Sequence, residues 1–171
     1  MARARSVALV ALLACKHHDA DPIPHAAAIH LDGEWDEPEW PHALRAQMRT
    51  PDGALARPSS EMRLLRDDDN LYVGLYAADE DIRSTDAFDV TVGTLAIRVD
   101  AAGHITPPAI HGAVDRDGTL DDAHDNDEEW VVELAIPLGS ISPLASVHAR
   151  RCDTPKDGIL RCGEAELSLS R

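Results

Sequence analysis

The sequence has 171 residues, a length typical of a single domain, and carries 31 acidic against 16 basic side chains for a formal net charge of -15. A surface this negative repels phosphate backbones, so the composition argues against nucleic acid as a partner. Aromatic residues make up only 4% of the chain, which limits the rings that could stack on a sugar. No apolar stretch of the sequence approaches the roughly 20 residues that span a bilayer.

The first residues have the pattern of an export signal. Arg3 and Arg5 are followed by a short apolar run over 6–14 and then by Cys15. The Leu-Leu-Ala-Cys end of this run resembles the bacterial lipobox, in which the cysteine is acylated after cleavage. An ordinary signal peptide with a coincidental cysteine is the alternative. We predict a lipoprotein signal peptide over 1–14 and a lipid anchor on Cys15, which would place the protein in a bacterial cell envelope.

The following segment, 15–28, is rich in histidine, proline and alanine and lacks periodicity, so we predict a flexible tether. The pair His17 and His18 could bind a metal, but a solvated linker is the favoured interpretation. Lys16 directly follows the cysteine. By resemblance to enterobacterial lipoproteins it implies release from the inner membrane, and therefore an outer-membrane or cell-surface location.

From residue 29 onward, short alternating segments are separated by turn-forming residues. The clearest is 130–138, where Trp130, Val132, Leu134 and Ile136 share one apolar face. This pattern predicts an all-β fold, an antiparallel β-sandwich with a single domain over 29–171. Strands are expected over 29–33, 45–48, 61–66, 71–77, 87–92, 94–99, 104–114, 130–138, 147–151 and 164–169.

Two further features concern the ends of the expected core. Trp35 and Trp40 flank a proline-containing turn, and we expect both indoles to plug the end of the core rather than to form an exposed platform. Cys152 and Cys162 are expected to form a disulfide because an exported chain meets oxidising conditions. A metal site built on these two cysteines and a histidine is the alternative.

Three motifs occur in the order found in one known family. Residues 31–40 (LDGEWDEPEW) resemble the opening "LDG-x-x-DE-P-x-W" signature of family 9 carbohydrate-binding modules. Residues 66–73 (RDDDNLYV) are similar to its "DDxNLYV" hairpin, and residues 130–137 (WVVELAIP) are similar to its late "W-x-x-E-x-A-I-P" strand. The resemblance covers 29–171 and implies a jelly-roll-like sandwich, grouped with DOMON-like domains, that binds the ends of polysaccharides without catalysing a reaction.

Family members grip sugars between two tryptophans, but residues 84–90 resemble the cleft strand without its tryptophan. The tryptophan sandwich therefore does not transfer to this chain. Tyr76 and Phe88 are the remaining rings that could stack on a sugar, with Asp86 and Asp89 as neighbouring polar groups, and a position in the core is the favoured alternative for each ring.

A second group of acidic residues follows the strand expected near residue 114. The sequence Asp115-Arg116-Asp117-Gly118 resembles part of a calcium loop but fails the EF-hand pattern at both ends. A looser Ca²⁺ site is the candidate cofactor site, and a solvated turn is the favoured alternative. Its ligands would be Asp115, Asp117, Asp121 and Asp122.

These observations favour a non-catalytic, envelope-anchored carbohydrate-binding lipoprotein, expected as a monomer, whose partner is a polysaccharide or a cell-envelope glycan. The first alternative is a structural or protein-interaction lipoprotein that has lost the sugar site. A second is a haem-binding DOMON-like domain, for which Met48 and Met62 could act as ligands. An enzyme comes last, because the sequence contains neither a nucleophile elbow nor a phosphate-binding glycine loop.

Overall fold

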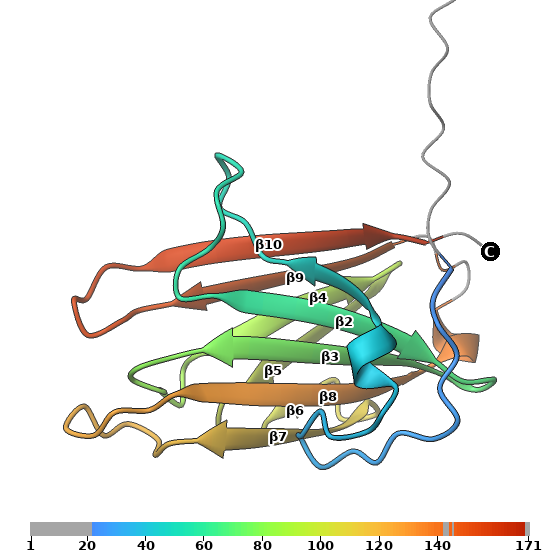
Figure 1. Cartoon of the computed structure of the whole chain (residues 1–171), viewed down its shortest axis with the longest axis horizontal. Helices are drawn as coiled ribbons and strands as arrows, with labels where there is room; N and C mark the ends of the chain where they lie inside the picture. Colours follow the sequence, from blue (N-terminus) through green and yellow to red (C-terminus); the bar gives the residue numbers. More distant parts are fainter. Residues whose placement is uncertain (1–21, 142–143, 145, 170–171) are drawn as a thin grey trace, which may run out of the picture.

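The computed structural model describes residues 22–141, 144 and 146–169. Ten strands and two short 3₁₀ turns make up its regular structure (Figure 1). They are β1 (Leu44–Gln47), β2 (Ser60–Arg66), β3 (Asn70–Ala78), β4 (Ala87–Val92), β5 (Leu95–Asp100), β6 (Ile105–Thr106), β7 (His111–Asp117), β8 (Glu129–Pro137), β9 (Ser146–Asp153) and β10 (Arg161–Ser168), with η1 (Trp40–His42) and η2 (Leu138–Ser140).

The strands form two five-stranded antiparallel sheets. One sheet has the order β1-β2-β3-β8-β7 and the other has the order β10-β9-β4-β5-β6. Figure 1 shows the first sheet in front of the second, with β8 between β3 and β7. The predicted all-β sandwich with a single domain is therefore confirmed.

The core lies between the sheets, and the inner face of β8 supplies its centre. Trp130, Val132, Leu134 and Ile136 are all fully buried, as the alternation of this strand predicts. Trp130 packs against Phe88 of the opposite sheet, with ring centroids 4.8 Å apart and planes at 50°. This tilted geometry is favourable for two aromatic rings and joins the two layers.

The strand predictions hold best where alternation is clean, as in β3 and β8, and the rougher pattern of 61–66 also forms a strand, β2. The region 104–114 contains the two-residue strand β6 and most of β7, which extends to Asp117. The prediction of a strand over 29–33 is wrong: this segment has no regular secondary structure, bends at residues 32 and 33, and lies outside the two sheets. Its backbone donors go to a side chain instead of to a neighbouring strand, as described below.

The prediction of a flexible tether fails for the last part of 15–28. Ile23 and Ala26 are buried, at 8% and 0% exposure. The Ala26 amide donates to the carbonyl of Arg66 at 2.7 Å, and the Arg66 amide donates to the carbonyl of Pro24 at 3.0 Å. The segment is fixed because the end of β2 supplies backbone partners for it. The signal peptide, Cys15 and the His17-His18 pair lie outside the described residues.

The N-terminal segment covers part of the outer face of the first sheet. A second apolar cluster lies there, separate from the main core, and it joins the segment to β2, β3 and β8. Figure 1 shows this segment, in blue and cyan, crossing the ends of those strands. The buried members of the cluster are Ala26, Trp40, Ala43, Leu65, Tyr72 and Ala135. The residues that the structure describes leave part of this outer face open.

The predicted disulfide between Cys152 and Cys162 is confirmed, with the two Cα atoms 4.1 Å apart. The cysteines are direct cross-strand partners in β9 and β10. The bond therefore joins two paired strands and closes the loop between them. Among the described residues, no helix is long and apolar enough to cross a membrane.

Candidate functional site

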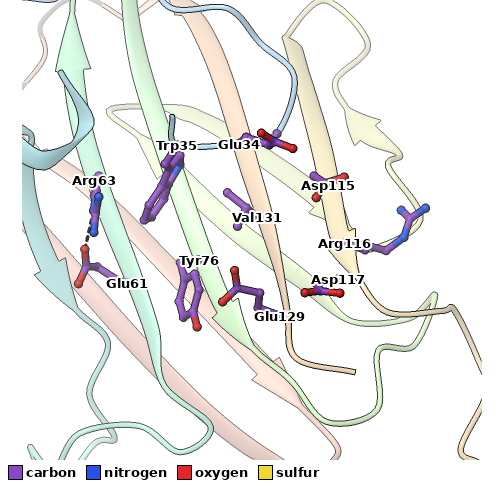
Figure 2. A pocket seen from close by; sticks show the side chains of 11 residues that line it. Glu34, Trp35, Glu61, Arg63, Tyr76, Asp115, Arg116, Asp117, Glu129 and Val131 are labelled. Carbon is purple, nitrogen blue, oxygen red and sulfur yellow. Dashed lines mark hydrogen bonds and ion pairs between the residues drawn. The ribbon is translucent and has the colours of Figure 1, made fainter. Parts of the chain in front are cut away.

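A pocket of about 570 Å³ lies on the open part of the outer face of the first sheet (Figure 2). Its floor is a row of cross-strand neighbours: Glu61 of β2 pairs with Tyr76 of β3, Tyr76 with Val131 of β8, and Val131 with Asp115 of β7. Residues 33–35 form one wall. Side chains alternate between the two faces along a strand, so the residues of this floor are those whose side chains point away from the core.

Trp35 forms the wall nearest the centre of the first sheet. Its indole edge rests on Gly74, where a Cβ atom would lie only 2.8–2.9 Å from Nε1, Cε2 and Cζ2. Any side chain at position 74 would therefore collide with the indole. The Arg63 guanidinium lies 4.2 Å from the Trp35 ring centroid, a cation–π contact. The rings of Trp35 and Tyr76 are 6.2 Å apart and tilted by 42°, so the pocket contains an aromatic pair.

Glu133 fixes this wall to the sheet. Its Oε2 accepts the backbone amides of Asp32 and Gly33 at 3.1 and 3.0 Å, and its Oε1 accepts Trp40 Nε1 at 2.9 Å. The side chain is fully buried, and burial raises its pKa to about 7 despite these donors. Gly33 has a φ of +95° and approaches Asp115 too closely for a Cβ, so the turn requires glycine.

Tyr76 and Glu129 define the electrostatics of the floor. Burial raises the pKa of Tyr76 to about 12, and the negative charge of Glu129 acts in the same direction. Tyr76 therefore stays a neutral hydrogen-bonding ring at any physiological pH. A pocket with aromatic rings and oriented carboxylates can bind the apolar face of a sugar ring and accept hydrogen bonds from its hydroxyl groups.

Of the four residues predicted to bind sugar, the structure places only Tyr76 in this pocket. Phe88 is fully buried in the main core, which confirms the favoured interpretation of this ring and shows that its candidate role as a stacking residue is wrong. Asp86 lies directly before β4 and is buried, at 4% exposure, near Arg151. Asp89 is exposed and pairs with Arg98 at 2.7 Å on the other sheet. The cleft strand of the family motif therefore contributes to the core and to the second sheet.

The expectation that both Trp35 and Trp40 plug the core holds for Trp40 alone, which is 1% exposed. Trp35 stacks on Trp40, with centroids 5.6 Å apart, but is only half-buried and lines the pocket. The role of Glu133 was also missed. The signal available in the sequence was its position as the one charged residue within the apolar run 130–137 of β8.

The four aspartates predicted to bind calcium do not converge. Asp115 and Asp117 lie on the outer face of β7 at the pocket. Asp121 accepts the Ser84 amide at 3.1 Å, and Asp122 accepts the amide of His124 at 3.0 Å. The sequence pattern reflects a solvated turn and a pocket rim, because the chain leaves β7 before the second pair.

Within the described ranges, one carboxylate group has the spacing of a metal site: Asp79, Asp86 and Asp153, all buried, with oxygens within 4.8 Å of one another. The Arg151 guanidinium lies among them, 2.7 Å from Asp79 and 3.6 Å from Asp153. Burial raises the pKa of Asp86 to about 7 and that of Asp153 to about 6. Arg151 already supplies positive charge here, so we describe the group as an ion-pair network.

Met48 and Met62, the ligands of the haem alternative, are 1% and 0% exposed. Both belong to the main core between the sheets. The described part of the chain therefore offers no exposed thioether for a haem.

The fold resembles a solved structure of known type. No family model matches the chain, and no curated protein matches it. A family 9 carbohydrate-binding module from Caldicellulosiruptor kristjanssonii, solved in complex with cellotriose, superposes with a TM-score of 0.59 at 14% identity. The similarity covers 87% of this chain and 93% of that module. The chain therefore has the fold of a family 9 carbohydrate-binding module, as the three sequence motifs predict.

Proposed function

We propose that the chain is a non-catalytic carbohydrate-binding protein whose binding site is the pocket lined by Trp35 and Tyr76. The observation that carries this proposal is the pair of rings, 6.2 Å apart, in a pocket rimmed by carboxylates. Sugar sites combine apolar rings with a few oriented polar groups in this way. The fold shared with a module solved in complex with cellotriose supports the same class of ligand.

The site differs from the tryptophan sandwich that family resemblance would suggest. One ring is the tyrosine of β3, and the other is a tryptophan from the opening motif that stands on Gly74. A short oligosaccharide would lie against Tyr76 with Trp35 at its side. The open pocket counts against the alternative of a protein-interaction module without a sugar site, since that alternative predicts a surface without an aromatic-lined groove.

We also propose that Cys15 carries a lipid and holds the protein at a bacterial envelope. The support is the charged start, the apolar run and the Leu-Leu-Ala-Cys sequence. Mass spectrometry of the protein from membranes tests this: a diacylglycerol-modified Cys15 at the new N-terminus is expected. A mature chain with an unmodified cysteine would remove the anchor and leave the sugar site unaffected.

Isothermal titration calorimetry with a panel of oligosaccharides tests the binding function. Tyr76→Ala and Trp35→Ala are each expected to weaken binding by at least about tenfold, because each removes one ring of the pair. Ile159→Ala is the matched control, since Ile159 is 60% exposed in the loop before β10 and lies outside the pocket. Binding that survives both ring substitutions would place the sugar elsewhere.

A further inference from the structure

The pocket carries an excess of negative charge that the sugar-binding function alone does not require. Five carboxylates line it against two guanidinium groups: Glu34, Glu61, Asp115, Asp117 and Glu129 against Arg63 and Arg116. The formal charge of the lining is therefore -3. A neutral sugar needs hydrogen-bond acceptors, but it does not need this many unbalanced charges.

Arg63 offsets only Glu61, and Arg116 offsets none of the lining carboxylates. Arg63 pairs with Glu61 at 2.6 Å and lies over the Trp35 ring. Arg116 lies opposite Trp130 in the register, on the core side of β7, and donates to the carbonyl of Ala101 at 2.6 Å. Figure 2 shows its guanidinium directed away from Tyr76 and Val131.

Four of the five carboxylates stay uncompensated: Glu34, Asp115, Asp117 and Glu129 form no ion pair with any residue that the structure describes. Asp117 and Glu129 are also direct cross-strand partners. Like charges placed directly opposite each other destabilise a sheet, so this pair has an energetic cost that a bound cation would offset.

The same floor contains the aromatic pair. Tyr76 and Glu129 line the same pocket, so a sugar ring that stacks on Tyr76 would place its substituents near these carboxylates. Aromatic faces also attract cations. The net charge of -15 for the whole chain acts against anionic polymers such as uronate-rich glycans.

From this arrangement we propose that the pocket selects an amino sugar whose protonated amine faces Asp117 and Glu129, in preference to neutral or acidic sugars. The inference rests on the proposed carbohydrate-binding function and names the ligand class of that site. The pyranose face would stack on the rings, and the ammonium group would pair with the carboxylates. A β-linked glucosamine oligomer is the simplest ligand with both features.

Three trimers with the same β-1,4 backbone test the proposal: the glucosamine trimer, the N-acetylglucosamine trimer and cellotriose, which differ at C2 only. In calorimetric titrations of the full chain at about pH 6 and low salt, the glucosamine trimer is expected to bind at least about tenfold more tightly than cellotriose. At about pH 9 the amine is neutral and the difference is expected to disappear.

Each other outcome has a distinct meaning. If cellotriose binds as tightly as the glucosamine trimer, the charge preference is wrong and the carbohydrate function stands. If none of the trimers binds while another oligosaccharide of the panel does, the inference fails and the carbohydrate function stands; if no oligosaccharide binds, both fail. Spermidine, a polyamine without a ring, is the control ligand: equal affinity for spermidine would overturn the proposal, because the pocket would then respond to charge alone.

Asp117→Asn is the variant that separates charge from packing. It is expected to weaken binding of the glucosamine trimer at least about threefold more than binding of cellotriose, because the amide keeps an oxygen acceptor but loses the charge. Asp68→Asn removes the same charge from the β2–β3 turn, where the side chain is 93% exposed, and is expected to change neither affinity. An equal loss for both trimers in Asp117→Asn would contradict the proposal.

Discussion

The Glu133 carboxylate accepts a hydrogen bond from the Trp40 indole at 2.9 Å, which ties the opening motif to strand β8 across 93 positions of the chain. The other oxygen of Glu133 holds the amides of Asp32 and Gly33. One buried side chain thus fixes both ends of the segment that carries Trp35. The pocket wall therefore depends on a residue that does not line the pocket.

Replacing Glu133 with alanine is expected to lower the free energy of unfolding by about 3 kcal/mol, because the substitution leaves buried N–H donors without a partner. It should also weaken oligosaccharide binding by releasing Trp35. Urea denaturation and calorimetry measure the two effects. Glu166→Ala on the exposed face of β10 is the control. A variant as stable as the parent would show that the segment is held by apolar contacts alone.

Glu133 also predicts a pH dependence of stability. Its pKa of about 7 in the folded protein lies above the ordinary value of 4.5. The folded state therefore binds the proton more tightly, so the contribution is fully present below about pH 4.5 and is lost as pH rises through about 7. In Glu133→Gln this loss should be absent. Plots of the free energy of unfolding against pH should therefore differ in slope between the two proteins by up to about 1.4 kcal/mol per pH unit. Parallel slopes for the two proteins would refute the raised pKa.

The contact between Gly74 and Trp35 predicts that the pocket closes to ligand when a methyl group is added. Gly74→Ala places a Cβ within 3 Å of the indole, so Trp35 must move. We expect a shift in tryptophan fluorescence and at least about a tenfold loss of sugar affinity. Gly139→Ala is the matched control, because a Cβ there meets open space. Unchanged sugar affinity in Gly74→Ala would show that binding does not depend on the position of the Trp35 indole.

The buried network around Arg151 is expected to be sensitive to loss of its cation. Arg151→Met leaves Asp79, Asp86 and Asp153 buried without a positive partner, and should cost about 3 to 5 kcal/mol near neutral pH. The cost should be smaller at about pH 5, where Asp86 and Asp153 are protonated. Thermal unfolding at both pH values measures this difference. An equal cost at the two values would indicate lost packing instead of lost charge.

The disulfide predicts a modest contribution to stability. Replacing Cys152 and Cys162 together with serine should lower the free energy of unfolding by about 2 to 3 kcal/mol, as expected for a loop of this length. Because the bond joins β9 and β10 on the second sheet, sugar binding at the first sheet should not change. A loss of binding would show that the two sheets are coupled more tightly than their contacts indicate.

Much of the fold follows from local patterns in the sequence. The alternation of β2, β3 and β8 reports which side chains face the core, so these strands could be predicted one at a time. The segment 29–33 could not, because an irregular segment bonded to the Glu133 side chain has the same alternation as a strand. Local periodicity does not reveal where backbone donors find their partners.

The candidate site was harder to predict because it depends on pairing between distant strands. Glu61, Tyr76, Val131 and Asp115 become neighbours only through the register of four strands. Trp35 could not be told from Trp40 by sequence, since its exposure depends on a glycine 39 positions away that supports the indole. Phe88 was assigned to the site by analogy with a motif, and its strand face turns toward the core.

The most direct test of the sugar site is to follow the indole N–H signals of the three tryptophans by NMR during titration with an oligosaccharide. Trp35 lines the pocket, whereas Trp40 and Trp130 are buried at 1% and 0% exposure. We predict that the Trp35 signal shifts in a saturable manner while that of Trp130 stays in place. A bound sugar that leaves Trp35 unchanged, or a protein that binds no oligosaccharide, would contradict a sugar site at this pocket.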